Sequence, residues 1–132
     1  MTGVVCVIPA FNAAPTLRGV IDGLRASLPG AAIVGIDDGS TDATASIMRD
    51  SCDLSESFPA NRGKGAALQA GFSHATTLGA KRVVTIDADG QHDPSCAPAL
   101  GPFLLHGLKN HEGKSVETVA GARPASWRRL MF

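Results

Sequence analysis

The sequence predicts an α/β domain with a mostly parallel β-sheet and helices on both faces of the sheet. Short apolar runs rich in β-branched residues, typical of strands buried on both faces, recur along the chain. Segments with apolar residues at helical spacing lie between these runs. The resulting series of strand, helix, strand, helix, weak strand, helix and strand is typical of crossover units, which build a parallel sheet covered by helices.

The first strand is expected over residues 4–8 and is closed by Pro9. The apolar residues of the next segment, 17–28, repeat with the period of a helix, and Pro15 suits its first turn. Residues 32–36 form a second buried-strand run. This part of the chain therefore predicts one strand–helix–strand unit.

The middle of the chain continues the pattern. Residues 39–42 supply a turn and a capping residue for a short helix that extends to about Met48. Residues 52–58 are polar for a strand, which favours a position at the edge of the sheet. A further helix is marked by apolar residues over 68–78, and residues 82–86 are a clear strand.

The last third is less regular. Residues 94–108 have the composition of a helix, but Pro98 and Pro102 predict that it is short or kinked. Residues 116–120 alternate as a last strand, and 121–132 form a tail that contains arginines.

Composition limits the classes of function. The chain of 132 residues has the length of one domain, and its 12 basic and 12 acidic residues cancel, which argues against nucleic acid as a partner. Three distant cysteines, Cys6, Cys52 and Cys96, predict reduced thiols and not a disulfide framework. No signal peptide and no membrane span is expected, so the protein should be soluble and cytoplasmic. That location leaves contact with the cytoplasmic face of a membrane open.

Acidic side chains gather directly after two of the predicted strands. Two segments contain them: Asp37, Asp38 and Asp42 in one, and Asp87, Asp89 and Asp93 in the other. Neighbouring carboxylates repel one another, and a hard cation such as Mg²⁺ or Mn²⁺ relieves that repulsion. Asp87 and Asp89 share one side of an extended chain, and Gln91 adds an amide oxygen. These three residues are the predicted metal ligands; in the alternative interpretation, the acids only cap turns.

A basic, glycine-containing loop precedes the third predicted helix. Residues 61–65 read Asn-Arg-Gly-Lys-Gly, and the N-terminus of a helix attracts anions. Arg62 and Lys64 are therefore candidates for contact with a phosphate or nucleotide; the alternative is a solvated basic turn. The loop is neither a P-loop nor a complete dinucleotide fingerprint, and the chain has no G-x-S-x-G nucleophile motif.

Four motifs in order resemble those of family 2 glycosyltransferases, which have the GT-A fold. The motifs are residues 7–12 (Val-Ile-Pro-Ala-Phe-Asn), 36–42 (Ile-Asp-Asp-Gly-Ser-Thr-Asp), 61–67 (Asn-Arg-Gly-Lys-Gly-Ala-Ala) and 87–92 (Asp-Ala-Asp-Gly-Gln-His). The last of these looks most like the branch of polyprenyl-phosphate (dolichol-phosphate) mannosyl- and glucosyltransferases. Residues 119–123 look like a later strand and turn of that branch.

The resemblance implies a role for each matching position. Pro9, Ala10 and Asn12 would border the nucleotide pocket. Asp37 would meet the base or ribose, and Asp38 would lie beside it. Asp87 and Asp89 would form the DxD element, with Asp89 as the catalytic residue and with Asp89 and Gln91 in direct contact with the metal. Arg62 and Lys64 would help to hold the donor, and Arg123 would approach the donor's diphosphate or an acceptor phosphate. The resemblance also implies a single GT-A domain, with residues 1–94 binding the nucleotide-sugar and 95–132 beginning an acceptor side that is shorter than usual and looks truncated.

These inferences define one leading function and two alternatives. A metal-dependent, inverting glycosyltransferase would move a hexose from GDP-mannose or a UDP-sugar to an acceptor. A polyprenyl phosphate suits as acceptor because a phosphate monoester is already anionic at neutral pH, and the sequence offers no clear general base. The alternatives are a non-catalytic nucleotide-sugar-binding module that needs a partner, and a nucleotidyltransferase.

Overall fold

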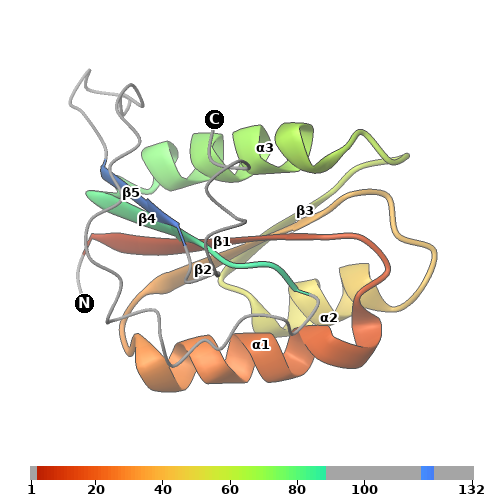
Figure 1. The fold of residues 1–132 in the computed structure, drawn as a ribbon, viewed down its shortest axis with the longest axis horizontal. Helices are drawn as coiled ribbons and strands as arrows, with labels where there is room; N and C mark the ends of the chain where they lie inside the picture. The colour runs from red at the N-terminus through yellow and green to blue at the C-terminus, as the bar shows by residue number, and fades with distance from the viewer. Residues whose placement is uncertain (1–2, 89–116, 121–132) are drawn as a thin grey trace.

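The computed structural model describes residues 3–88 and 117–120, which form a five-stranded sheet whose paired strands are all parallel (Figure 1). The strands are β1 (Val4–Ala10), β2 (Ala32–Asp37), β3 (Leu54–Ser57), β4 (Arg82–Thr85) and β5 (Glu117–Ala120). The helices are α1 (Ala14–Ser27), α2 (Thr44–Ser51) and α3 (Lys64–Thr77). The order across the sheet is β3-β2-β1-β4-β5, so the predicted α/β class and parallel sheet are confirmed.

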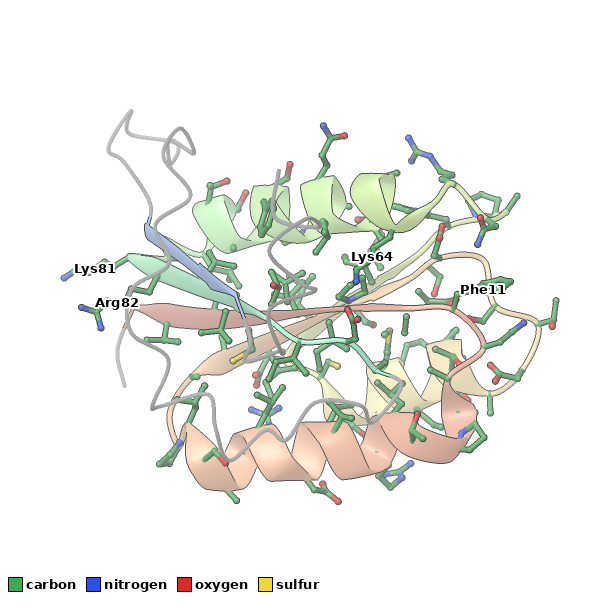
Figure 2. All side chains as sticks on the ribbon, viewed as in Figure 1. Phe11, Lys64, Lys81 and Arg82 are labelled. Atoms are coloured by element: carbon green, nitrogen blue, oxygen red, sulfur yellow. The ribbon has the colours of Figure 1, made fainter. Side chains whose placement is uncertain are left out.

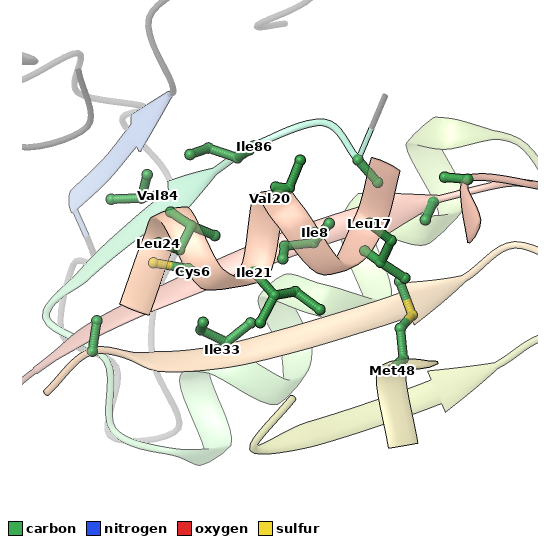
Figure 3. Close-up of a cluster of buried hydrophobic side chains, with 14 of the residues drawn as sticks. Cys6, Ile8, Leu17, Val20, Ile21, Leu24, Ile33, Met48, Val84 and Ile86 are labelled. Atoms are coloured by element: carbon green, nitrogen blue, oxygen red, sulfur yellow. The ribbon is translucent and has the colours of Figure 1, made fainter. Parts of the chain in front are cut away.

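The helices cover both faces of the sheet, as predicted. Figure 1 shows α1 and α2 on one face and α3 on the other. Successive residues of β1 point to opposite faces, so Cys6 and Ile8 pack with α1, whereas Val5 and Val7 pack with α3. The α1 side holds the larger cluster, with Leu17, Ile21 and Leu24 at its centre (Figure 3). A sheet buried on both faces explains why its strands are continuous apolar runs.

One glycine allows α3 to lie very close to the sheet. A Cβ atom at Gly71 would lie 2.2 Å from Cγ1 of Val7, which is fully buried in the central strand. Real Cβ atoms do not approach a carbon so closely, so the distance between helix and sheet depends on the missing side chain. Because α3 begins at Lys64, this contact also sets where that lysine lies relative to β1.

The first strand is longer than the sequence indicates. The expectation that Pro9 closes it is wrong, because β1 continues to Ala10 and pairs with β2 up to Asp37. The carbonyl of Val7 accepts the N–H of Ile86, which directly follows β4. The nitrogen of Pro9, two residues later in β1, faces the same side of the strand as that carbonyl, toward the β4 side. The register of β1 with β4 ends at Thr85, so no ladder hydrogen bond is lost at the proline.

The remaining elements agree with the sequence apart from their ends. The weak strand is at the edge of the sheet as predicted, beside β2. β4 is one residue shorter than expected, α2 is longer and ends at Ser51, and β5 agrees with the expected last strand over the residues that the structure describes there. Pro15 stands in the first turn of α1. The helix predicted over 94–108 lies outside the described residues.

Two of the three cysteines are free thiols in the described part of the chain. Burial raises the pKa of the Cys6 thiol to about 12 and that of Cys52 to about 11. Both are therefore protonated at neutral pH and poor nucleophiles, as expected of structural thiols. Cys96 lies outside the described residues. Across residues 3–88 and 117–120, no helix combines the length and apolar character needed to cross a bilayer.

Candidate functional site

A pocket lies where the direction of the strand order reverses. β1 is central, the chain proceeds outward to β2 and β3, and it then returns to β4 on the other side of β1. In open α/β sheets, ligands bind beyond the carboxyl ends of strands at this switch point. The structure has a pocket there of about 190 Å³, lined by Pro9, Ala10, Phe11, Ala13, Asp38, Lys64, Ala67, Asp87 and Ala88. The lining combines the end of β1 and the segments that follow β1, β2 and β4 with the first turn of α3.

Asn12 joins the loop after β1 to the loop after β2. Its backbone N–H donates to Oγ of Ser40 at 2.8 Å, and its side-chain Oδ1 accepts the N–H of Thr41 at 2.9 Å. The residue has a φ of 49°, a left-handed conformation that asparagine tolerates better than most residues. Asn12 therefore joins these two loops through both its backbone and its side chain, and it is not among the residues that line the pocket.

Asp42 fixes the beginnings of two helices. One carboxylate oxygen accepts the N–H of Thr44, the first residue of α2, at 2.9 Å, and the other accepts the N–H of Ala14, the first residue of α1, at 3.2 Å. Hydrogen bonds from the Thr44 hydroxyl and N–H lower the pKa of Asp42. The prediction that residues 39–42 supply the capping residue of this helix is wrong by one position, because the N-cap of α2 is Ala43, whose side chain makes no capping hydrogen bond. Asp42 binds the first N–H of α2 from the residue before the N-cap.

Asp38 is buried, and its carboxylate holds the loop that leads into α3. Oδ1 accepts the N–H of Arg62 at 2.7 Å, and Oδ2 accepts the N–H of Gly63 at 3.1 Å and the side-chain amide of Asn61 at 3.1 Å. Sequence reasoning expected the N–H groups of this basic loop to face a phosphate. Two of them instead bind an internal carboxylate, which leaves the Lys64 side chain as the cationic group of this loop that lines the pocket.

Asp37 and Arg62 also have partners outside the pocket. Asp37 is 2% exposed, and its Oδ1 accepts the N–H of Ser40 at 3.0 Å, which stabilises the turn after β2. The guanidinium of Arg62 lies over the ring of Phe58, 4.7 Å from its centroid, and Arg62 lines a separate depression along α3. Among the predicted site residues, the structure brings five together in the lining of one pocket: Pro9, Ala10, Asp38, Lys64 and Asp87. Three others are not part of this lining: Asn12, Asp37 and Arg62.

Lys64 and Asp87 form an ion pair across the pocket. Nζ of Lys64 lies 2.7 Å from Oδ1 of Asp87, and the side chains are 41% and 15% exposed. Figure 2 shows Lys64 extending from α3 over the carboxyl end of the sheet, while Lys81 lies at the opposite end of the molecule. The lysine is the first residue of α3 and the aspartate follows β4, so the ion pair links the start of this helix to the segment after β4.

The donor chemistry of this edge suits a hard divalent cation in part. Asp87 presents carboxylate oxygen to the pocket, and carboxylate oxygen is the preferred protein ligand of Mg²⁺ and Mn²⁺. In the described stretch of the chain, no group of three or more histidine, cysteine, aspartate or glutamate side chains gathers as a metal site. Asp89, Gln91 and Arg123, the other residues predicted for metal and donor, lie outside the described residues.

Four lining residues escaped the sequence reasoning: Phe11, Ala13, Ala67 and Ala88. Phe11 directly follows β1, and Ala88 lies three residues after the end of β4. Their positions just beyond strand ends are the feature of the sequence that could have predicted their place in the pocket. Phe11 is 51% exposed, unusual for a large apolar side chain; it lies in the loop that follows β1 and lines the pocket (Figure 2). The alanines carry no chemical signal and line the pocket because of where the chain places them.

We expect Asp38→Asn to destabilise the protein by about 2–3 kcal/mol, because a buried carboxylate that accepts three N–H bonds would be replaced by a neutral group with one acceptor oxygen. Urea denaturation measures the change. Asp22→Asn, at an exposed position of α1, is the matched control and should change stability by less than about 0.5 kcal/mol. Equal effects of the two substitutions would contradict the role given to Asp38.

The fold and the pocket place the chain among GT-A domains. The solved structure of the mannosyltransferase PcManGT from Pyrobaculum calidifontis, in complex with GDP-Man and Mn²⁺, superposes with a TM-score of 0.60 at 27% identity. The match covers 71% of this chain and 29% of that one. The GT-A class predicted from the sequence is therefore confirmed.

Residues 5–111 match the family described as Glycosyl transferase family 2, and the chain belongs to that family. Protein RfbJ of Shigella flexneri is 30% identical over 117 residues, covering 89% of this chain and 82% of the relative. A UDP-N-acetylglucosamine–dolichyl-phosphate N-acetylglucosaminyltransferase of Methanococcus voltae is 32% identical, over 89% of this chain and 50% of the relative.

Another relative has undecaprenyl phosphate in its name. The undecaprenyl-phosphate 4-deoxy-4-formamido-L-arabinose transferase of Salmonella paratyphi A is 35% identical over 71% of this chain and 31% of its own length. The likeness to the polyprenyl-phosphate branch of the family is thereby confirmed. The chain spans half or less of the length of both relatives named for a polyprenyl phosphate.

Proposed function

We propose that this protein binds a nucleotide-sugar in the pocket at the switch point and transfers its hexose to a polyprenyl phosphate. The observation that carries the proposal is the opposition of Lys64 and Asp87 in that pocket, at 2.7 Å. One group suits the phosphates of a nucleoside diphosphate and the other suits the divalent cation that accompanies them. The relatives named for dolichyl and undecaprenyl phosphate support the acceptor class.

Each site residue has a proposed task. Pro9 and Ala10 form the floor of the pocket under the nucleotide, and Asn12, Asp37 and Asp38 hold the two loops that border it. Lys64 binds the diphosphate, with Arg62 and Arg123 as further cationic groups on the donor or acceptor. A cation held by Asp87, Asp89 and Gln91 would stabilise the negative charge of the departing diphosphate.

The proposed reaction is a single displacement at the anomeric carbon. An oxygen of the acceptor phosphate forms the new bond on one face of the sugar as the bond to the nucleoside diphosphate breaks on the other. The electron pair leaves with the diphosphate oxygen, and the anomeric configuration inverts. No general base is required, because the attacking phosphate is already anionic at neutral pH. We place this reaction at the cytoplasmic face of a membrane, where a polyprenyl phosphate is accessible to a protein.

The direct test incubates the 132-residue chain with Mn²⁺, undecaprenyl phosphate and radiolabelled GDP-mannose or UDP-N-acetylglucosamine. The expected result is a labelled lipid with inverted anomeric configuration, formed by the wild type and not by Asp89→Ala. Donor binding without transfer to any lipid phosphate would overturn the catalytic proposal and identify a binding module. Pyrophosphate release from a nucleoside triphosphate and a sugar 1-phosphate would instead identify a nucleotidyltransferase.

A further inference from the structure

The contact between Lys64 and Asp87 has a consequence for the order in which ligands enter the pocket. Asp87 is the one residue of the proposed cation-binding set that lies in the described part of the chain, and its Oδ1 already contacts the ammonium of Lys64 at 2.7 Å. An ammonium and a divalent cation on the same carboxylate would lie within a few ångströms of each other and repel. The lysine therefore occupies the neighbourhood in which the cation is expected.

The lysine is able to leave this position. Its side chain is 41% exposed, whereas that of Asp87 is 15% exposed, so the lysine keeps more contact with solvent than its partner does. Lysine carries its charge on a flexible four-carbon chain with three donors, and it can turn toward a new anion without moving the helix. Its backbone is fixed, because α3 begins at Lys64 and the loop before it is held by Asp38.

We infer that Lys64 is an internal counter-ion that a divalent cation must displace from Asp87, and that the donor's diphosphate provides the place to which the lysine moves. With a diphosphate present, both cations have anionic partners and the repulsion between them falls. Nucleotide and cation then strengthen each other's binding, and by thermodynamic linkage this effect is equal in both directions. The inference rests on the proposed function, since it requires that the pocket binds a nucleoside diphosphate.

The inference predicts opposite effects of one substitution on two ligands. In Lys64→Met, Mn²⁺ alone should bind about two- to fivefold more tightly than to the wild type, because a partly exposed ion pair of this kind contributes up to about 1 kcal/mol. GDP and UDP should bind about tenfold more weakly, since a charge-assisted contact to phosphate is lost. A lysine that only binds phosphate would lower nucleotide affinity and leave the affinity for Mn²⁺ alone unchanged.

Electron paramagnetic resonance of free Mn²⁺ measures the metal affinity, and calorimetric titration measures GDP and UDP with and without Mn²⁺. Lys81→Met is the matched control, because Lys81 is an exposed lysine at the opposite end of the sheet (Figure 2). It should leave both affinities unchanged, and thermal unfolding confirms that each variant is folded.

Two results would overturn the inference, and they are distinguishable. If the wild type binds nucleotide with Mn²⁺ but Lys64→Met binds Mn²⁺ alone no more tightly, the exchange is wrong and the proposed function stands. If the wild type binds neither GDP nor UDP in the presence of Mn²⁺, the proposed function fails and the exchange fails with it.

Discussion

Replacing Gly39 by alanine is expected to destabilise the protein by about 4 kcal/mol, more than any other glycine-to-alanine change that the described residues offer. Gly39 has a φ of +77°, where a Cβ atom costs about 1–2 kcal/mol. Its Cβ would also lie 2.4 Å from the backbone carbonyl carbon of Ala60 and 2.5 Å from the N of Asn61. Backbone atoms cannot turn aside as a flexible side chain can, so the two loops must separate.

Separation of these loops also bears on the pocket. The residue before Gly39 is Asp38, whose carboxylate holds Arg62 and Gly63 in front of α3. A shift between the two loops would break these hydrogen bonds and move Lys64. We therefore expect Gly39→Ala to lose nucleotide affinity even at temperatures where the protein remains folded.

Gly79→Ala is the matched control for the effect of backbone conformation alone. Gly79 has a φ of +75°, close to that of Gly39, but a Cβ there would meet no atom within 4 Å. This variant should lose about 1–2 kcal/mol and keep its ligand affinity. Equal losses for the two variants in urea denaturation would show that the close contact between the loops is not a determinant of stability.

Gly71→Ala is expected to destabilise the protein by about 2–3 kcal/mol, although alanine is the better helix former by about 1 kcal/mol. The new methyl group would overlap Cγ1 of Val7, at 2.2 Å, in the contact between α3 and the central strand. Helix or strand must move outward, and both are packed on other elements.

A second substitution tests the cause. Val7→Ala removes the overlapping methyl groups. The double variant should therefore lose less stability than the two single variants lose in sum, by about 1 kcal/mol or more. Denaturant unfolding of the wild type, the two single variants and the double variant measures this coupling. Effects that add within about 0.5 kcal/mol would show that the helix is not held against the strand by this contact.

The sequence predicted the elements well because each depends on neighbours in the chain. The β-branched run at 4–8 and the helical spacing of Leu17, Val20 and Ile21 report burial on particular faces. The end of the first strand was harder to predict. Whether Pro9 interrupts a strand depends on where β4 stops pairing beside it, which no local pattern reveals.

The sequence predicted which types of residue gather at the site more accurately than it predicted which groups those residues contact. Acidic side chains at strand ends indicated a ligand site, and the pocket does lie there. Nothing in the local sequence shows that Asp38 accepts N–H groups from residues 24 and 25 positions later, or that Lys64 pairs with Asp87. These contacts depend on how the crossovers bring distant loops to one edge of the sheet.

The most direct measurement of the central claim is thermal unfolding of the 132-residue chain with GDP or UDP, in the presence of Mn²⁺ and in its absence. A ligand at about one hundred times its Kd stabilises the folded state by about 2.7 kcal/mol, so a rise of several degrees in Tm is expected with nucleotide and Mn²⁺ together. Asp89→Ala should abolish this rise, whereas Asp22→Ala, at an exposed position of α1, should retain it. Absence of any rise with GDP, UDP or their sugar derivatives would contradict the assignment of the pocket to a nucleotide-sugar.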